Sequence, residues 1–183
     1  HVLETVKSVG IVNKIIVTNP SNDDQIRKNT DSDLGISYAI QDTPLGTGHA
    51  VQIAKDSIPP DTDNIMILFG DVPLINTSTL KEISELLENS DICIISFNKD
   101  NPYGYGRIVK DKDDRVISIV EEVDASIEIK SIKNCFSGLI AFKNVKILSL
   151  VDLLDNNNIQ NEYYLTQIIS LAAERKLNIS NVV

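Results

Sequence analysis

Residues 65–74 read IMILFGDVPL, and this stretch decides how the rest of the chain is organised. Its five leading apolar residues, bounded by turn formers, predict a strand buried on both faces in a mostly parallel sheet. The run stops at Gly70, where backbone can approach a ligand closely, and Asp71 then presents a carboxylate. Pro73 ends any ladder pairing. An acid just past the carboxyl end of a central strand lies where open α/β sheets bind ligands, although a capping Asp in a strand-to-helix loop fits this stretch equally well.

The first half of the chain alternates between expected strands and helices. Helical spacing of apolar residues, stopped by Gly10, predicts a first helix over 3–9. The further expected strands are 14–18, 36–40 and 92–97, and the further expected helices are 25–29, a segment from Ala50 to the Pro59-Pro60 pair, and 79–87, where Thr79 and Glu82 have capping-box spacing. This order implies right-handed crossovers and a parallel sheet, hence an α/β fold class.

The second half is expected to be richer in β structure. Residues 101–107 form a tight loop, and strands over 108–110 and 116–123 flank the charged turn 111–114, which predicts a β-hairpin. Helical apolar spacing predicts helices over 145–154 and 163–173, followed by a last strand over 177–183.

The composition is that of one globular domain and disfavours several classes of partner. With 183 residues and 42% hydrophobic content, the chain can form a substantial core. The formal charge of -9 argues against nucleic acid or an anionic membrane surface as the main partner, but a metal ion and backbone amides could still hold a phosphate. No apolar run approaches the ~20 residues that cross a bilayer, and no secretory segment opens the chain. Cys93 and Cys135 lack metal-ligand spacing, so we expect buried thiols and a cytoplasmic location.

The loop LGTGHA at 45–50 follows a strand and opens a helix. Its two glycines allow close backbone approach to a ligand, and the amides of the first helical turn favour an anion or a polar heterocycle. A purely structural turn is the commoner use of such glycines. Just upstream, the carboxamide of Gln41 can donate and accept together, which suits a base such as uracil, whereas a surface Gln is the plainer interpretation.

Two adjacent carboxylates, Glu121 and Glu122, end an expected strand. Because neighbouring side chains on a strand point to opposite faces, at most one of them looks into a cleft and the other decorates the surface. Gly106 lies in a loop where a side chain would block a ligand, or simply at the entry of a hairpin. No nucleophile–histidine arrangement emerges, so covalent catalysis is not expected, and His49 is interpreted as a hydrogen-bonding residue at a helix end.

Taken together and in this order, these segments closely resemble one family. It is the uridyltransferase domain of the bacterial bifunctional N-acetylglucosamine-1-phosphate uridyltransferase/glucosamine-1-phosphate acetyltransferase. The segments are Gln41 with LGTGHA at 45–50, GDVPL at 70–74, YGRI at 105–108, VEE at 120–122, SG at 137–138 and NEYYLT at 161–166. The resemblance covers essentially the whole chain, and the pair LGTGHA and GDVPL at this separation is specific. It implies a Rossmann-like nucleotidyltransferase (nucleotide-diphospho-sugar transferase) fold whose β-rich second half binds the sugar.

The resemblance also implies a reaction and its residues. UTP and N-acetylglucosamine 1-phosphate would give UDP-N-acetylglucosamine and pyrophosphate, for cell-wall and lipopolysaccharide precursors, by in-line attack without a covalent intermediate. Asp71 would be the catalytic residue that binds Mg²⁺, a hard cation for which one carboxylate plus one more protein oxygen suffices. The nucleotide-binding residues would be Gln41, Gly46, Thr47, Phe69 and Gly70, and the sugar-binding residues Gly106 and Glu121.

The chain departs from the family pattern at two internal positions. The family's Asn before the Thr/Ser-Gly pair is Phe136 here, and we expect Asn134, two residues away on the same strand face, to take over the sugar contact. The family's Asp after Tyr-Tyr-Leu/Ile-Thr is Gln167, which puts any charge-dependent role there in doubt.

Both ends of the chain look cut through structure, so residues 1–183 are interpreted as a single nucleotidyltransferase domain truncated at both ends. The family's glycine-rich loop would precede His1, and its second metal ligand and hexapeptide-repeat domain would follow Val183. Such a piece is expected to be inactive alone, and the full-length protein is expected to be a homotrimer. Two alternatives stay open: another sugar-1-phosphate nucleotidyltransferase, or a non-catalytic module that senses a sugar nucleotide.

Overall fold

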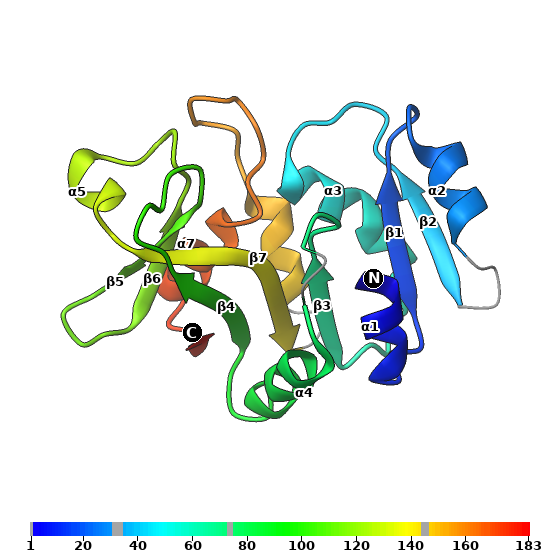
Figure 1. Cartoon of the computed structure of the whole chain (residues 1–183), viewed down its shortest axis with the longest axis horizontal. Coiled ribbons are helices and arrows are strands. Elements are labelled where there is room, and N and C mark those ends of the chain that lie inside the picture. Colours follow the sequence, from blue (N-terminus) through cyan, green and yellow to red (C-terminus); the bar gives the residue numbers. More distant parts are fainter. Residues whose placement is uncertain (1, 31–34, 73–74, 144–146) are drawn as a thin grey trace.

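The computed structural model describes residues 2–30, 35–72, 75–143 and 147–183. Strands and helices alternate along the first half, and a hairpin and a long strand dominate the second (Figure 1). The strands are β1 Lys14–Thr18, β2 Ile36–Ile40, β3 Asn64–Leu68, β4 Ile92–Asn98, β5 Arg107–Lys110, β6 Val116–Val120, β7 Asn134–Lys143 and β8 Ile179–Val182. The helices are α1 Val2–Ser8, α2 Asp23–Asn29, α3 Thr47–Ala54, α4 Thr77–Leu86, α5 Ile127–Lys130 and α7 Gln167–Glu174, with 3-10 turns η2 Lys55–Ser57 and η3 Ser149–Leu153.

The long strand β7 organises the larger sheet. β3 and β4 lie on either side of its second half and both pair with it antiparallel, so β3 and β4 run in the same direction with β7 between them. The crossover through α4 therefore joins two strands of common direction, as expected, but they are not neighbours. The α/β class is confirmed, whereas the sheet is mixed instead of mostly parallel, because β7 returns from the second half of the chain into the gap between β3 and β4.

The two ends of the molecule are built differently (Figure 1). At one end, β1 and β2 pair in parallel, as their alternation with α2 predicted. At the other end, β5 and β6 form the expected antiparallel hairpin, and β8 adds in parallel to the outer edge of β4. Where β7 passes from the hairpin end to β3, its Gly138 has φ +85°, and the register of its pairing with β4 shifts between Ile94 and Ser96.

Apolar side chains pack on both faces of the larger sheet. One face is covered by α3, η3 and α7, and the other by α1 and α4. The apolar stripe of α4 contributes Leu80 and Ile83, which are buried as the helical spacing predicted. Cys93 and Cys135 are buried free thiols, as expected, and burial raises the pKa of the Cys93 thiol to about 11. A buried, protonated thiol of this kind is unreactive.

Two expectations about helix starts were wrong. α4 begins earlier than expected, and Asn76 caps it: Asn76 Oδ1 accepts the Thr79 backbone N–H at 2.9 Å, in place of a Thr79–Glu82 capping box. α7 begins at Gln167, so residues 163–166 are not helical. Of the helix expected over 145–154, residues 149–153 form a 3-10 turn, and 145–146 lie outside the described residues.

Candidate active site

The turn at residues 45–48 joins β2 to α3 and is packed against a distant segment, 162–165. Gly46 has φ +109° and ψ 172°, a conformation almost restricted to glycine, and a Cβ built on it would lie 2.6 Å from the Tyr163 carbonyl oxygen. A Cβ on Gly48 would lie 2.8 Å from the same oxygen. These two glycines are thus required by the protein's own backbone, whatever ligand they also admit.

Hydrogen bonds fix this turn to the distant segment. The Gly48 N–H donates to the Tyr163 carbonyl at 2.7 Å, and the Tyr163 N–H donates to the Leu45 carbonyl at 2.8 Å. The Leu165 N–H donates to the Thr47 hydroxyl oxygen at 3.0 Å. The Gly48 amide, expected to face an anion at the start of α3, is therefore already occupied.

Gln41 is a buried residue, 9% exposed, and its carboxamide is held in one orientation. Its Nε2 lies 3.1 Å from the Gly46 carbonyl oxygen and 2.8 Å from His49 Nδ1. Because an amide nitrogen only donates, His49 Nδ1 accepts, and the two Nε2 hydrogens are both used. The Oε1 atom of Gln41 is then the part of the carboxamide left to contact a base, as an acceptor. The interpretation of His49 as a hydrogen-bonding residue at a helix end is confirmed.

The end of β3 lies beside the bend in β7. The Phe69 N–H donates to the Gly138 carbonyl at 3.3 Å, and the Phe69 ring meets the Phe136 ring edge-on with centroids 6.2 Å apart. A Cβ on Gly138 would come within 2.8 Å of the Phe69 ring, so glycine is needed there. No atom of the described residues lies within 4 Å of a Cβ built on Gly70, and Asp71 is exposed. The expectation that Pro73 ends pairing falls outside the described residues.

Glu121 is the carboxylate that points into the structure. Its Oε1 accepts the Thr166 hydroxyl at 2.8 Å, and its Oε2 lies 3.3 Å from a Cβ built on Gly106. Burial is the largest influence on this group and raises the pKa of Glu121, while the Thr166 hydrogen bond lowers it and the charge of Asp124 raises it further. Gly106 and Glu121 are therefore together, as the two expected sugar-binding residues should be.

The expectation that the other carboxylate is surface decoration was wrong. Glu122 pairs with the guanidinium of Arg107, whose side chain is 1% exposed, and the same guanidinium donates to the Tyr105 carbonyl. The Arg107 hydrogen bond is the largest influence on Glu122 and holds the pKa of that carboxyl below its ordinary value. A buried charge needs such a partner, because an unpaired one is costly in an apolar interior.

Asn134, which is expected to replace the family's Asn at position 136, and Gln167, the second departure from the family pattern, both bond to other parts of the fold. Asn134 Nδ2 donates to the Ser96 hydroxyl at 3.0 Å and to Asn98 Oδ1 at 3.4 Å, on the neighbouring strand. The Oδ1 atom of Asn134 is buried and has no hydrogen-bond partner among the described residues, which leaves it free to accept. Gln167 Oε1 accepts the Asp155 N–H at 3.0 Å, a contact that needs no charge. The sugar contact of Asn134 stays a prediction.

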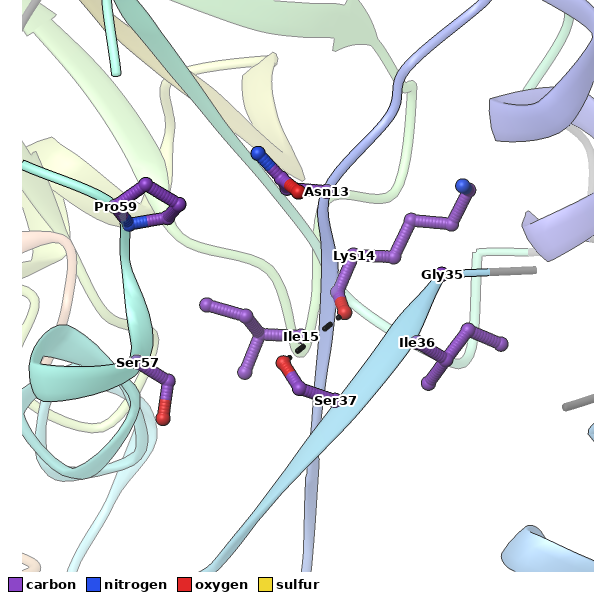
Figure 2. A pocket seen from close by; sticks show the side chains of 8 residues that line it. All are labelled: Asn13, Lys14, Ile15, Gly35, Ile36, Ser37, Ser57 and Pro59. Atoms are coloured by element: carbon purple, nitrogen blue, oxygen red, sulfur yellow. Dashed lines mark hydrogen bonds between the residues drawn. The ribbon is translucent and has the colours of Figure 1, made fainter. Parts of the chain in front are cut away.

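Two cavities of the molecule are lined by neither Gln41, Asp71 nor Glu121, although the second is lined by Asn134. One of about 190 Å³ lies at the amino ends of β1 and β2, where the Ser37 hydroxyl donates to the Lys14 carbonyl at 3.4 Å (Figure 2). It is at the opposite ends of these strands from Gln41 and the 45–48 turn. A second, of about 420 Å³, is lined by Asn98, Ile108, Lys110, Ile132, Asn134 and Val183.

The predicted site residues thus fall into three groups that share contacts. The 45–48 turn with Gln41, the pair Gly106 and Glu121, and the end of β3 are linked through segment 163–166 and through β7, since the Phe136 N–H donates to the Gly106 carbonyl at 2.9 Å. Among the described residues, no group of three or more His, Cys, Asp or Glu side chains is placed to hold a metal, and no helix is long and apolar enough to cross a membrane.

Sequence reasoning missed the structural part played by Tyr163 and Thr166. Their apolar and aromatic neighbours have helical spacing, and that pattern hides the non-helical backbone that contacts the 45–48 turn. The one signal in the sequence was that NEYYLT at 161–166 is among the segments that resemble the family. This resemblance singles out the residues but does not indicate their structural role.

Comparison with known proteins decides the family. A family model described as nucleotidyl transferase matches residues 1–179. The chain belongs to the nucleotidyl transferase family. The resemblance drawn from the motifs, and the fold class that it implied, are thereby confirmed.

Curated relatives of this nucleotidyltransferase chain include several proteins named bifunctional protein GlmU. The protein of Brucella anthropi is 36% identical over 184 residues, covering 100% of this chain and 40% of the relative. That of Bartonella bacilliformis is 37% identical over 183 residues, with the same two coverages of 100% and 40%. That of Caldicellulosiruptor saccharolyticus is 40% identical over 138 residues, covering 74% of this chain and 30% of the relative. The chain spans 40% of the length of the first two relatives.

Proposed function

We propose that the protein transfers the uridylyl group of UTP to N-acetylglucosamine 1-phosphate, giving UDP-N-acetylglucosamine and pyrophosphate. One observation carries this proposal. Segment 163–166 is hydrogen-bonded at one end to the 45–48 turn and at the other end to Glu121. The turn expected to contact the nucleotide and the carboxylate expected to contact the sugar are therefore both hydrogen-bonded to one short segment. Such an arrangement supports a reaction between a nucleotide and a sugar phosphate, which depends on holding the two in register.

The orientation of Gln41 supports a uracil base. With both Nε2 hydrogens given to the Gly46 carbonyl and to His49 Nδ1, the Oε1 atom is left to accept a hydrogen bond. Uracil presents a ring N–H between two carbonyls, which matches an acceptor, whereas cytosine has an unprotonated ring nitrogen at that position. The burial of Gln41 makes the discrimination stronger, because a buried polar atom left unpaired costs about 1–3 kcal/mol.

The exposed carboxylate of Asp71 fits Mg²⁺. It is a hard oxygen donor just after the end of β3, next to Gly70, and Mg²⁺ binds through one or two carboxylates plus substrate phosphates while keeping waters. Bound there, the ion would neutralise charge on the phosphates. We assign Asp71 as its ligand and as the catalytic residue, and Gly70 and Phe69 as the residues that let the phosphates approach.

The reaction needs no covalent intermediate on the protein. An oxygen of the sugar phosphate attacks the α-phosphorus of UTP, the bond to the β-phosphate oxygen breaks, and pyrophosphate leaves. The protein's part is alignment: Gln41 holds the base, the Gly46-Thr47 turn holds the ribose side, and Glu121 Oε2 accepts a hydrogen bond from a sugar hydroxyl beside Gly106. A carboxylate used as an acceptor needs only to stay ionised, so Glu121 requires no proton transfer.

The test measures pyrophosphate release by the full-length protein with UTP, N-acetylglucosamine 1-phosphate and Mg²⁺, beside Asp71→Asn. We expect turnover that falls by at least about a hundredfold in the variant, the size of loss seen when a group that stabilises transition-state charge is removed. Asp63→Asn is the matched control, since Asp63 is also exposed and precedes the amino end of the same strand. It should leave turnover unchanged.

The outcomes separate the alternatives. Equal turnover in Asp71→Asn would refute the metal role of Asp71. Turnover only with another sugar phosphate or another nucleoside triphosphate would replace the proposed substrates. A folded protein that binds UDP-N-acetylglucosamine without any turnover would favour a sensing module. The resemblance also underlies the proposals that the full-length protein is a homotrimer and acts in the cytoplasm, and sedimentation of that protein tests the first.

A further inference from the structure

Thr166 is a buried residue whose hydroxyl has an unexpected use. It stands at the start of α7, 4% exposed, where a threonine ordinarily caps the helix with its side chain. Here it has φ -60° and ψ -24° and makes no capping hydrogen bond. Its hydroxyl donates instead to Glu121 Oε1 at 2.8 Å, across 45 residues of sequence. The Thr166 hydroxyl therefore has a role other than capping α7.

The hydrogen bond from Thr166 gives the two carboxylate oxygens of Glu121 different surroundings. Oε1 is taken by Thr166, while Oε2 lies on the side of Gly106, 3.3 Å from where a Cβ of residue 106 would stand. Because Gly106 has no side chain, the space in front of Oε2 is not filled from that position. A carboxylate anchored through one oxygen presents the other in a fixed direction.

The same segment fixes where Thr166 stands relative to the 45–48 turn. The Leu165 N–H donates to the Thr47 hydroxyl oxygen, and Tyr163 exchanges backbone hydrogen bonds with Leu45 and Gly48. Leu165, which contacts Thr47, directly precedes Thr166, which contacts Glu121. A connection this short restricts how far Thr47 and Glu121 can move relative to each other.

We propose that Thr166 is a positioning residue for the sugar phosphate: its hydroxyl anchors Glu121 Oε1 so that Oε2 faces the sugar, and segment 163–166 sets that oxygen at a fixed distance from the nucleotide turn. The inference rests on the proposed function, because it assigns Glu121 to the sugar. It adds a residue that touches neither substrate.

The charged surroundings of Glu121 predict a pH effect. Burial and, to a smaller extent, the charge of Asp124 after β6 raise the pKa of Glu121, and the neighbouring Tyr164 has a pKa raised to about 12, chiefly by burial, so that it is neutral. Glu122 on the same strand end is paired with Arg107. The Thr166 hydrogen bond is the contribution that lowers the pKa of Glu121. Losing it raises that pKa further, so the carboxylate is neutralised at a higher pH than before.

The experiment compares Thr166→Val and Thr166→Ser in the full-length protein, with initial rates measured while either substrate is varied. Removing one hydrogen bond to a charged group should raise the KM for N-acetylglucosamine 1-phosphate about tenfold. The KM for UTP should change less than about twofold, since the backbone contacts to the 45–48 turn remain. In the valine variant, the acid limb of kcat/KM for the sugar phosphate should move to higher pH. In the serine variant, the KM for the sugar phosphate and the pH of the acid limb should both return to the wild-type values.

The matched control is Thr18→Val, which removes another buried hydroxyl–carboxylate hydrogen bond, that of Thr18 to Asp23 at 2.6 Å. It should leave the acid limb for the sugar phosphate in place. A wild-type KM in Thr166→Val, equal rises in both KM values, or an acid limb that does not move would each overturn the positioning role. If the valine variant does not fold, a serine variant that differs from wild type in either readout would overturn it. Absence of turnover in the wild-type protein would instead refute the proposed function.

Discussion

Replacing Gly46 by alanine should be one of the most destabilising single-methyl changes in this chain. The added Cβ would stand 2.6 Å from the Tyr163 carbonyl oxygen, 2.9 Å from the Tyr163 nitrogen and 3.0 Å from Glu162 Cβ. Two of these atoms are backbone, so no side-chain rotation relieves the clash. The residue would also have to hold φ +109° and ψ 172°, which only glycine adopts readily.

The magnitude follows from two contributions. The backbone conformation costs about 1–3 kcal/mol for a residue with a Cβ. Moving Tyr163 away breaks its hydrogen bonds with Leu45 and Gly48, each with a net value of about 1 kcal/mol. The free energy of unfolding should therefore fall by about 3–5 kcal/mol, a large share of the roughly 5–15 kcal/mol of a typical domain.

Urea unfolding of the 183-residue chain measures this. With an m-value of about 2 kcal/mol per M, the midpoint should fall by about 2 M. Gly10→Ala is the matched control, since Gly10 also has a positive φ, +78°, but no atom of the residues that the structure describes lies within 4 Å of an added Cβ. That variant should cost only about 1–2 kcal/mol. Equal midpoints for the two variants would refute the conclusion that packing of Tyr163 against the turn requires glycine.

Two further variants test other parts of the structure. Glu122, with its pKa lowered by Arg107, contributes stability that is present above the ordinary carboxyl pKa of about 4.3 and is lost as pH falls through the lowered value. The Glu122→Gln variant should thus lose less of its free energy of unfolding than the wild type as the pH falls below about 4. Urea unfolding at a series of pH values measures this, and an unaltered pH profile would contradict the pairing. Asn134→Ala removes a buried acceptor without a partner among the described residues, and should raise the KM for the sugar phosphate roughly fivefold in the full-length protein. An unchanged KM would rule out the sugar contact.

Local patterns in the sequence were sufficient for the elements whose partners are near in the chain. The parallel pair β1 and β2, separated by α2, and the hairpin of β5 and β6 appear where strand periodicity and turn residues placed them. Gly70 and Asp71 follow β3 as the opening stretch indicated, and in the described part of the chain no atom lies within 4 Å of a Cβ built on Gly70. These features depend on residue spacing and on turn chemistry, which are properties of neighbouring residues.

Long-range contacts decided the rest. The apolar residues around Cys135 form β7, but local sequence patterns did not indicate that this strand would lie between β3 and β4 and make the sheet mixed. Strand direction depends on which edge supplies hydrogen-bond partners, and strand periodicity is the same for either direction.

The site follows the same division. The motifs of the sequence by themselves determined the family and the candidate residues Gln41, Asp71 and Glu121. Only the tertiary structure decided that α7 begins at Gln167 and leaves residues 163–166 outside the helix, although their spacing is helical. The Tyr163 N–H and carbonyl and the Leu165 N–H pair with the 45–48 turn instead of with a further turn of α7, and backbone polar groups in a packed interior must be paired. It is this non-local pairing that joins the nucleotide turn to Glu121.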